Sequence, residues 1–144
     1  MRRKRERPEV DYAEIMATSK AEKYASLKWR EVLSKVEELT AGGGEPGEEG
    51  AAMTPMQALR QAGYSEAIID YPTSPLGLHI YRKTGRPLTS GFVGDAAKLL
   101  NISWDEARRL MKLNADVLNG VQEGNLEKAK SGLSGLESAL GGEL

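Results

Sequence analysis

The sequence predicts an all-α fold, in which a small helical domain with a helix-turn-helix is accompanied by an N-terminal and a C-terminal helix. Apolar residues recur at steps of three and four in residues 25–39 and again in residues 126–140, which is the spacing of one helix face. Residues 93–112 also fit the pattern of two helices joined by a tight turn. The chain of 144 residues is long enough for this domain and its appended segments.

Residues 1–10 are predicted to be a disordered basic arm, because they hold Pro8 and almost no apolar side chain to bury. Such an arm either binds nucleic acid through its charges or solubilises a terminus, and both interpretations stay open. The arm residues that are candidates for nucleic-acid binding are Arg2, Arg3, Lys4 and Arg5.

Residues 11–40 are predicted to form an N-terminal helical segment. Ser19 and Glu22 have the spacing of a capping box at a helix start, and a separate short helix near residues 12–16 also fits the pattern. The apolar stripe that follows needs a partner surface, which is either the downstream domain or a second copy of the chain. The predicted interface residues of this helix are Trp29, Val32, Val36 and Leu39.

Residues 41–53 are predicted to be a Gly/Glu-rich linker, because they combine five glycines and a proline with three glutamates. A flexible tether would let the N-terminal helix pack on a neighbouring subunit as easily as on its own chain. The sequence therefore favours a homo-oligomer.

Residues 54–140 are predicted to form the helical domain, which begins with two short helices. Thr54, followed by a proline, is a strong helix start, and this first helix is expected to end at Gly63. Ser65 is placed to cap a second short helix that reaches Asp70.

The first of these helices and its turn contain a Gln-Ala pair and a Gly-Tyr-Ser turn, within residues 54–67. This run resembles the N-terminal helix-turn-helix of bacteriophage small terminase subunits. The resemblance implies a viral DNA-packaging protein that assembles as a ring, recognises the phage genome and hands it to an ATP-driven large subunit. Pro72 and Pro75 depart from the family, because they shorten the second helix, which is the one that would read DNA.

Residues 71–94 contain three prolines and four glycines, which exclude a long helix. Residues 78–81 form either a short strand or a helical turn. His79, which lies between apolar neighbours, is more typical of a structural histidine than of a catalytic one. A compact basic turn follows, and its candidate phosphate contacts are Arg82, Lys83 and Arg86.

The most informative stretch is residues 93–112. Ala97 supplies the small residue that a helix crossing needs, and Asn101 tolerates the left-handed backbone of a tight turn. Ser103 then caps a second helix. The predicted inner face of this helix is Ala107, Leu110 and Met111.

The outward side of that second helix carries both signs of charge. Arg108 and Arg109 suit phosphates or guanine edges, and the predicted nucleic-acid-binding residues here are Ser103, Trp104, Arg108 and Arg109. Asp105 and Glu106 either repel a phosphate backbone or complement the helix dipole at its first turn.

The C-terminal stripe begins after Asn125 and is expected to end at Gly141. Gly132 and Gly135 weaken this helix by about 1 kcal/mol each relative to alanine, so it needs support from packing, on its own domain or on another subunit. Its predicted interface residues are Leu126, Leu133, Leu136 and Leu140.

Composition excludes several classes of function. The chain has no cysteine and one histidine, so it holds no thiol nucleophile, disulfide or histidine-pair metal site. No phosphate-binding glycine loop and no paired catalytic carboxylates occur, and we therefore expect neither an enzyme nor a cofactor. No apolar run reaches the roughly 20 residues of a membrane span, and we expect a cytoplasmic protein.

The resulting hypothesis is a non-enzymatic DNA-binding accessory protein that acts in viral genome recognition or packaging. The alternative is a small helical adaptor that binds a virion component or a host factor through protein contacts, with Trp29 and Trp104 as anchors. The net charge of -1 argues against a protein that coats DNA without regard to sequence.

Overall fold

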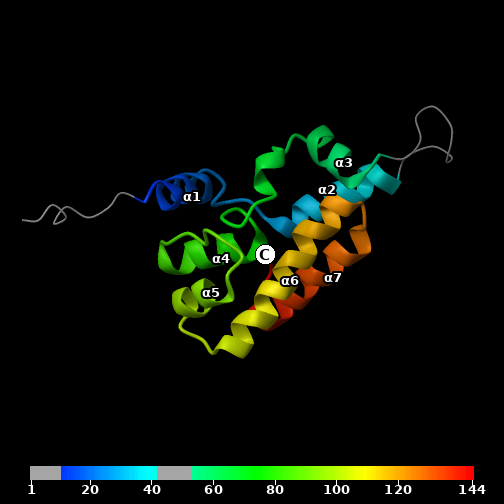
Figure 1. Cartoon of the computed structure of the whole chain (residues 1–144). Coiled ribbons are helices and arrows are strands. Elements are labelled where there is room, and N and C mark those ends of the chain that lie inside the picture. The colour runs from blue at the N-terminus through cyan, green and yellow to red at the C-terminus, as the bar shows by residue number, and fades with distance from the viewer. Residues whose placement is uncertain (1–10, 42–52) are drawn as a thin grey trace, which may run out of the picture.

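The structure, a computed structural model, describes residues 11–41 and 53–144 (Figure 1). Within these ranges the fold is helical and contains no strand, so the predicted all-α fold is confirmed, and residues 78–81 belong to a helix. The elements are α1 (Tyr12–Lys23), α2 (Trp29–Ala41), α3 (Pro55–Gln61), the 3-10 helix η2 (Glu66–Ile68), α4 (Pro75–Thr84), α5 (Val93–Leu100), α6 (Trp104–Glu123) and α7 (Leu126–Leu140).

The long helix α6 and the antiparallel α7 form the centre of the fold (Figure 1). They turn at Gly124, which adopts a left-handed backbone with φ of 82°. A Cβ on Gly120 would lie 2.6 Å from the backbone nitrogen of Ala129, and one on Gly132 would lie 2.6 Å from the carbonyl oxygen of Leu113. Glycine has a low helix propensity, but at these two positions the missing side chain permits close packing of α6 and α7.

The apolar stripe of α2 packs into the chain's own core, against α3 and α7. Trp29 is 1 % exposed, and its indole N–H donates a hydrogen bond of 2.8 Å to the carbonyl oxygen of Thr73. Val32 and Val36 are fully buried, and Leu39 packs against the same core. The prediction that these four residues contact another subunit is corrected, because the downstream domain covers them.

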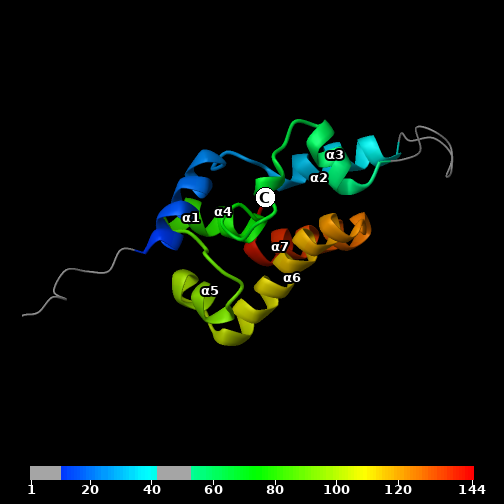
Figure 2. The ribbon, with the colours of Figure 1, turned by 45° about the horizontal axis from the view of Figure 1, so that its top comes forward.

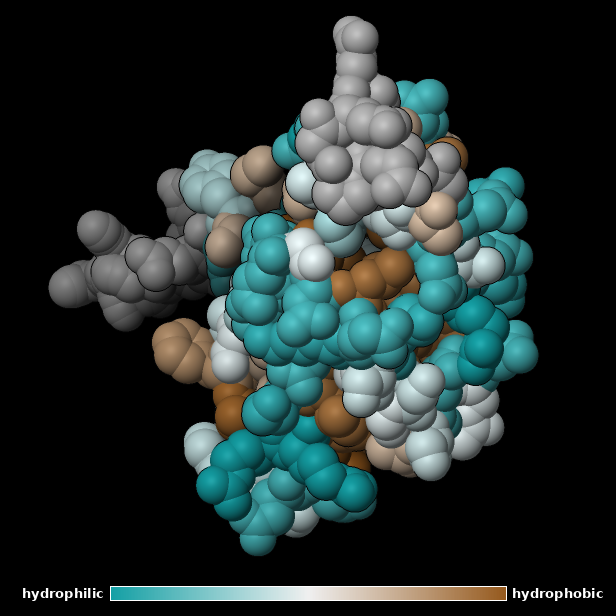
Figure 3. Space-filling view, turned by 90° about the vertical axis from the view of Figure 1, so that its right-hand side faces the viewer, coloured by the Kyte–Doolittle hydropathy of each residue, from teal (hydrophilic) through white to brown (hydrophobic). Residues whose placement is uncertain are grey.

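The apolar stripe of α7 is also covered by the chain itself. Leu133 and Leu136 are buried, and Leu126 and Leu140 are partly buried against the core. This stripe is likewise no interface, because α6 and α2 cover it within the chain. On the face shown in Figure 3, polar side chains surround the small apolar areas that reach the surface.

The predicted helix start at Ser19 is wrong, because Ser19 lies exposed inside α1. The helix begins instead at Tyr12 and is capped by Asp11, whose side chain accepts a hydrogen bond of 3.1 Å from the backbone N–H of Glu14. The helix continues through Ser19 to Lys23 because α1 packs on α4 and Lys20 forms an ion pair of 2.8 Å with Asp70. These tertiary contacts outweigh the local capping signal at Ser19.

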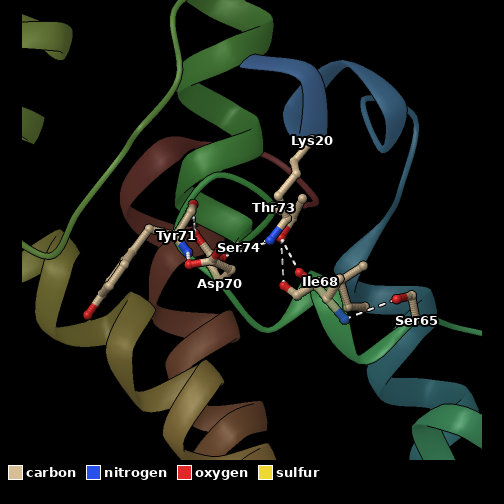
Figure 4. A network of polar contacts seen from close by, with 8 residues as sticks. Lys20, Ser65, Ile68, Asp70, Tyr71, Thr73 and Ser74 are labelled. Atoms are coloured by element: carbon tan, nitrogen blue, oxygen red, sulfur yellow. Dashed lines mark hydrogen bonds and ion pairs between the residues drawn. The ribbon is translucent and has the colours of Figure 1, made fainter. Parts of the chain in front are cut away.

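The segment that resembles small terminases forms α3, a turn and the single 3-10 turn η2. The second predicted helix is therefore shorter than expected and ends before Asp70. Side chains fold the chain back instead, as Figure 4 shows. Thr73 donates 2.8 Å to the carbonyl oxygen of Ile68, and Ser74 donates 2.7 Å to that of Tyr71. Three residues of 3-10 helix leave no recognition helix at this position.

Candidate nucleic-acid interface

Helices α5 and α6 are joined by a short turn whose backbone groups are hydrogen-bonded. Asn101 ends α5 in a left-handed conformation with φ of 56°. The backbone N–H of Ile102 donates 3.1 Å to the carbonyl oxygen of Ala97, and the Ser103 hydroxyl accepts 3.1 Å from the N–H of Glu106. The predicted turn and cap are confirmed, and together they set the direction in which α6 leaves α5.

The inner face of α6 is as the periodicity predicts. Ala107, Leu110 and Met111 are 0 %, 5 % and 6 % exposed. The fully buried small residue of α5 is Ala96, whereas the predicted Ala97 is only partly buried. The prediction of the crossing residue was thus one position late, while the packing of the two helices is as expected.

Figure 2 shows the α5–α6 corner at one end of the molecule, where the first turns of α6 reach away from α2 and α3. The outward side chains there are solvent-exposed, and Trp104 is 58 % exposed. The structure brings together the predicted site residues Ser103, Trp104, Arg108 and Arg109 on the first two turns of one helix.

The charges at this corner are partly paired. Arg108 contacts Asp105 at 3.0 Å, and Lys112 contacts Asp116 at 3.1 Å, both on the exposed surface of α6. Arg109 forms no ion pair with any residue in ranges 11–41 and 53–144. An exposed ion pair contributes roughly 0–1 kcal/mol, so Arg108 can exchange Asp105 for an external anion at little cost.

The predicted basic turn does not act as one unit. The Arg82 guanidinium donates 2.7 Å to the carbonyl oxygen of Ala25 and 2.5 Å to that of Leu27. Arg86 contacts Glu14 at 3.5 Å. Arg82 therefore holds the chain after α1 in place, whereas the exposed pair of Arg86 with Glu14, like that of Arg108 with Asp105, leaves Arg86 able to contact an external anion.

Lys83, the remaining cation of that turn, lies near α6. It lines an open cavity of about 240 Å³ together with His79, Glu106 and Arg109, over an apolar floor. Lys83 is thus the residue of the turn that joins the α6 site. The arm residues Arg2, Arg3, Lys4 and Arg5 lie outside the described residues.

Two exposed residues of this corner were not predicted from the sequence. Lys112 follows Arg108 by four residues, so the helical period already placed it on the same side. Phe92, which directly precedes α5, is 73 % exposed. No sequence signal separates an exposed phenylalanine from a buried one at such a position.

The cavity makes the stability of the fold depend on pH. Burial lowers the pKa of His79, and the charges of Lys83 and Arg82 lower it further, with Glu106 and Arg109 also facing the cavity. The unfolded chain then binds a proton at a higher pH than the folded protein, so stability falls as the pH drops below about 6.5.

We expect the free energy of unfolding to decrease between about pH 7.5 and 5.5, and to decrease less in a His79→Gln variant. Urea unfolding of both proteins at the two pH values measures the difference. Equal losses in the two proteins would remove His79 as a source of the pH dependence.

Among the described residues, no three His, Asp or Glu side chains are grouped so that they could hold a metal ion. None of the helices combines the length and apolar character that a bilayer span requires, within the same part of the chain. No protein-family model matches the chain, and no curated protein or solved structure matches it either.

Proposed function

We propose that the protein binds duplex DNA through the α5–α6 helix-turn-helix and performs no catalysis. One observation carries this proposal. The turn at Asn101 and the Ser103 cap project the exposed first turns of α6, with Trp104, Arg108 and Arg109, from one end of the molecule. In helix-turn-helix proteins these N-terminal turns of the second helix enter the major groove.

The site suits reading a sequence better than coating DNA. Arg108 and Arg109 can donate to guanine edges or phosphates, and Lys83 and Lys112 flank them. Asp105 and Glu106 complement the positive end of the α6 dipole, but they disfavour close approach of a phosphate backbone. We therefore expect about two to four phosphate contacts, and a correspondingly shallow salt dependence.

The resemblance of residues 54–67 to small terminase subunits supports viral genome packaging as the setting. Because η2 is a single 3-10 turn, the DNA contact in this proposal belongs to α5–α6 and not to the terminase-like segment. Arg60, the exposed cation of α3, contacts Glu66.

A second candidate function is a protein-binding adaptor. The exposed aromatic rings of Phe92 and Trp104 favour it, because such rings often dominate the energy of protein interfaces. Trp29 is not an anchor in either function, since it is buried in the core. In the adaptor the arginines of α6 contribute little.

Replacing Arg108 and Arg109 together with alanine is expected to weaken DNA binding by about 10- to 100-fold at about 0.1 M salt, from two lost contacts of roughly 1 kcal/mol or more each. Fluorescence anisotropy with duplexes enriched from a random pool measures this.

The matched control is a variant with Lys28→Ala and Lys35→Ala, which removes the same charge from exposed positions near and on α2. This control should retain its affinity within about twofold. An equal loss in both variants would reduce binding to net charge, and no loss in the arginine variant would favour the adaptor.

A further inference from the structure

The open cavity beside α6 lies where α4, α5, α6 and the end of α7 meet. Helix α4 contacts each of the other three helices, and the cavity has a volume of about 240 Å³. At the roughly 30 Å³ that one water occupies in the liquid, this volume accommodates about eight water-sized groups. The cavity is thus smaller than the sites of drug-sized ligands, which begin at about 300 Å³, and suits a molecule of about ten non-hydrogen atoms.

The floor of the cavity is apolar. Leu100 ends α5, Ile102 lies in the turn, and Leu110 belongs to α6. Ala139 and Leu140 complete the floor from the last turn of α7. Leu100, Ile102 and Leu140 are only half-buried, so they present apolar surface to the cavity. A ligand with an apolar body would remove this surface from water, which favours binding.

The charged side chains of the cavity carry a net positive charge. Lys83 and Arg109 supply two cations, and Glu106 supplies one anion. None of the three forms an ion pair or a side-chain hydrogen bond within residues 11–41 and 53–144. His79 is uncharged near neutral pH, because burial lowers its pKa and the charges of Lys83 and Arg82 lower it further. An anion in the cavity would therefore gain two cationic partners without breaking a contact of the described chain.

These charges select the class of anion. A guanidinium binds a carboxylate through two parallel N–H donors, and a lysine ammonium can add a third. Glu106 disfavours a second negative charge, so a monocarboxylate fits better than a phosphate monoester, which carries nearly two charges near neutral pH. A cationic ligand would meet two like charges, and a neutral one would leave both unused.

We propose that this cavity binds a small monocarboxylate with a compact apolar body. The carboxylate contacts Lys83 and Arg109, and the apolar body lies on the three half-buried residues of the floor. The site itself does not depend on DNA binding. Arg109 is also part of the proposed DNA surface, so a bound carboxylate should compete with DNA for its guanidinium, and this consequence rests on the proposed function.

Phenylacetate, with about ten non-hydrogen atoms, is the probe, and phenylacetamide is its uncharged counterpart of the same size. The ring protons of His79 report on the cavity in NMR spectra of the full-length protein, because this is the chain's only histidine. At constant pH we expect phenylacetate to shift them with a Kd of about 1 mM, and phenylacetamide to bind at least about tenfold more weakly. No shift up to about 20 mM, or equal binding of the two compounds, would overturn the proposal.

Variants separate the cavity from the general charge of the protein. Lys83→Gln together with Arg109→Gln should weaken phenylacetate binding at least about tenfold, whereas Lys28→Gln together with Lys35→Gln should change it less than about twofold. Ala139→Phe fills the cavity from an exposed position, keeps every charge, and should also weaken binding at least about tenfold. All these positions are exposed, so each variant should stay folded by circular dichroism. Wild-type affinity in either cavity variant would overturn the site.

The competition has a separate readout. Saturating phenylacetate should weaken duplex binding by about three- to tenfold in fluorescence anisotropy, relative to phenylacetamide in sodium chloride of equal ionic strength. DNA affinity that phenylacetate leaves unchanged would overturn the competition for Arg109. A protein that binds phenylacetate but no duplex would support the cavity and overturn only the proposed function, because the NMR titration contains no DNA.

Discussion

A Gly77→Ala variant is expected to lose at least about 3 kcal/mol of folding free energy, the upper end of what overpacking costs. A Cβ at this position would lie 1.9 Å from the carbonyl oxygen of Tyr71 and 2.9 Å from that of Pro72. Both neighbours are backbone, so no side chain can rotate away. The better helix propensity of alanine returns only about 1 kcal/mol, which the clash outweighs.

Urea unfolding followed by circular dichroism measures this loss. Gly94 is the matched control, because it also lies in a helix but a Cβ there meets only the Trp104 ring at 3.4 Å. Gly94→Ala should therefore be neutral or more stable than the wild type. If Gly77→Ala were as stable as Gly94→Ala, α4 would not sit as close to the preceding loop as the structure has it.

Features that depend on residues close together in the sequence could be predicted, whereas contacts between residues far apart in the sequence could not. The turn at Asn101, the cap at Ser103 and the end of the last helix at Gly141 depend on partners within about five residues, and the residue types alone indicate them. These signals were sufficient to find the turn between α5 and α6 and the end of α7, whereas the break between α1 and α2 and the bounds of α4 were not predicted.

Long-range contacts were invisible to the same reasoning. Arg82 looked like an exposed loop cation, but its partners Ala25 and Leu27 lie 57 and 55 residues away. Asn114, buried in α6, accepts from the N–H of Leu76 and donates to Ser74, each at 3.0 Å. An apolar stripe likewise predicts burial without naming the surface that covers it, which is why the α2 and α7 stripes were assigned to an interface.

The assignment of Trp29 can be tested directly, because its two roles predict opposite results. In the core position seen here, Trp29→Ala removes a side chain that is 1 % exposed and leaves the carbonyl oxygen of Thr73 without its hydrogen bond. We expect a loss of about 3–5 kcal/mol, a large part of the roughly 5–15 kcal/mol that stabilises a domain.

The measurement is urea unfolding by circular dichroism, with Trp29→Phe and Trp104→Ala for comparison. Phenylalanine keeps most of the packing but not the N–H, so it should lose less than alanine. Trp104, at 58 % exposed, should lose about 0.5 kcal/mol or less. If Trp29 were an interface anchor, its replacement would instead leave the stability of the monomer unchanged. That result would show that the α2 stripe lies at the surface and not in the core. The core position requires the order Trp29→Ala, Trp29→Phe, Trp104→Ala, from the largest loss to the smallest, because burial and the hydrogen bond to Thr73 decide it.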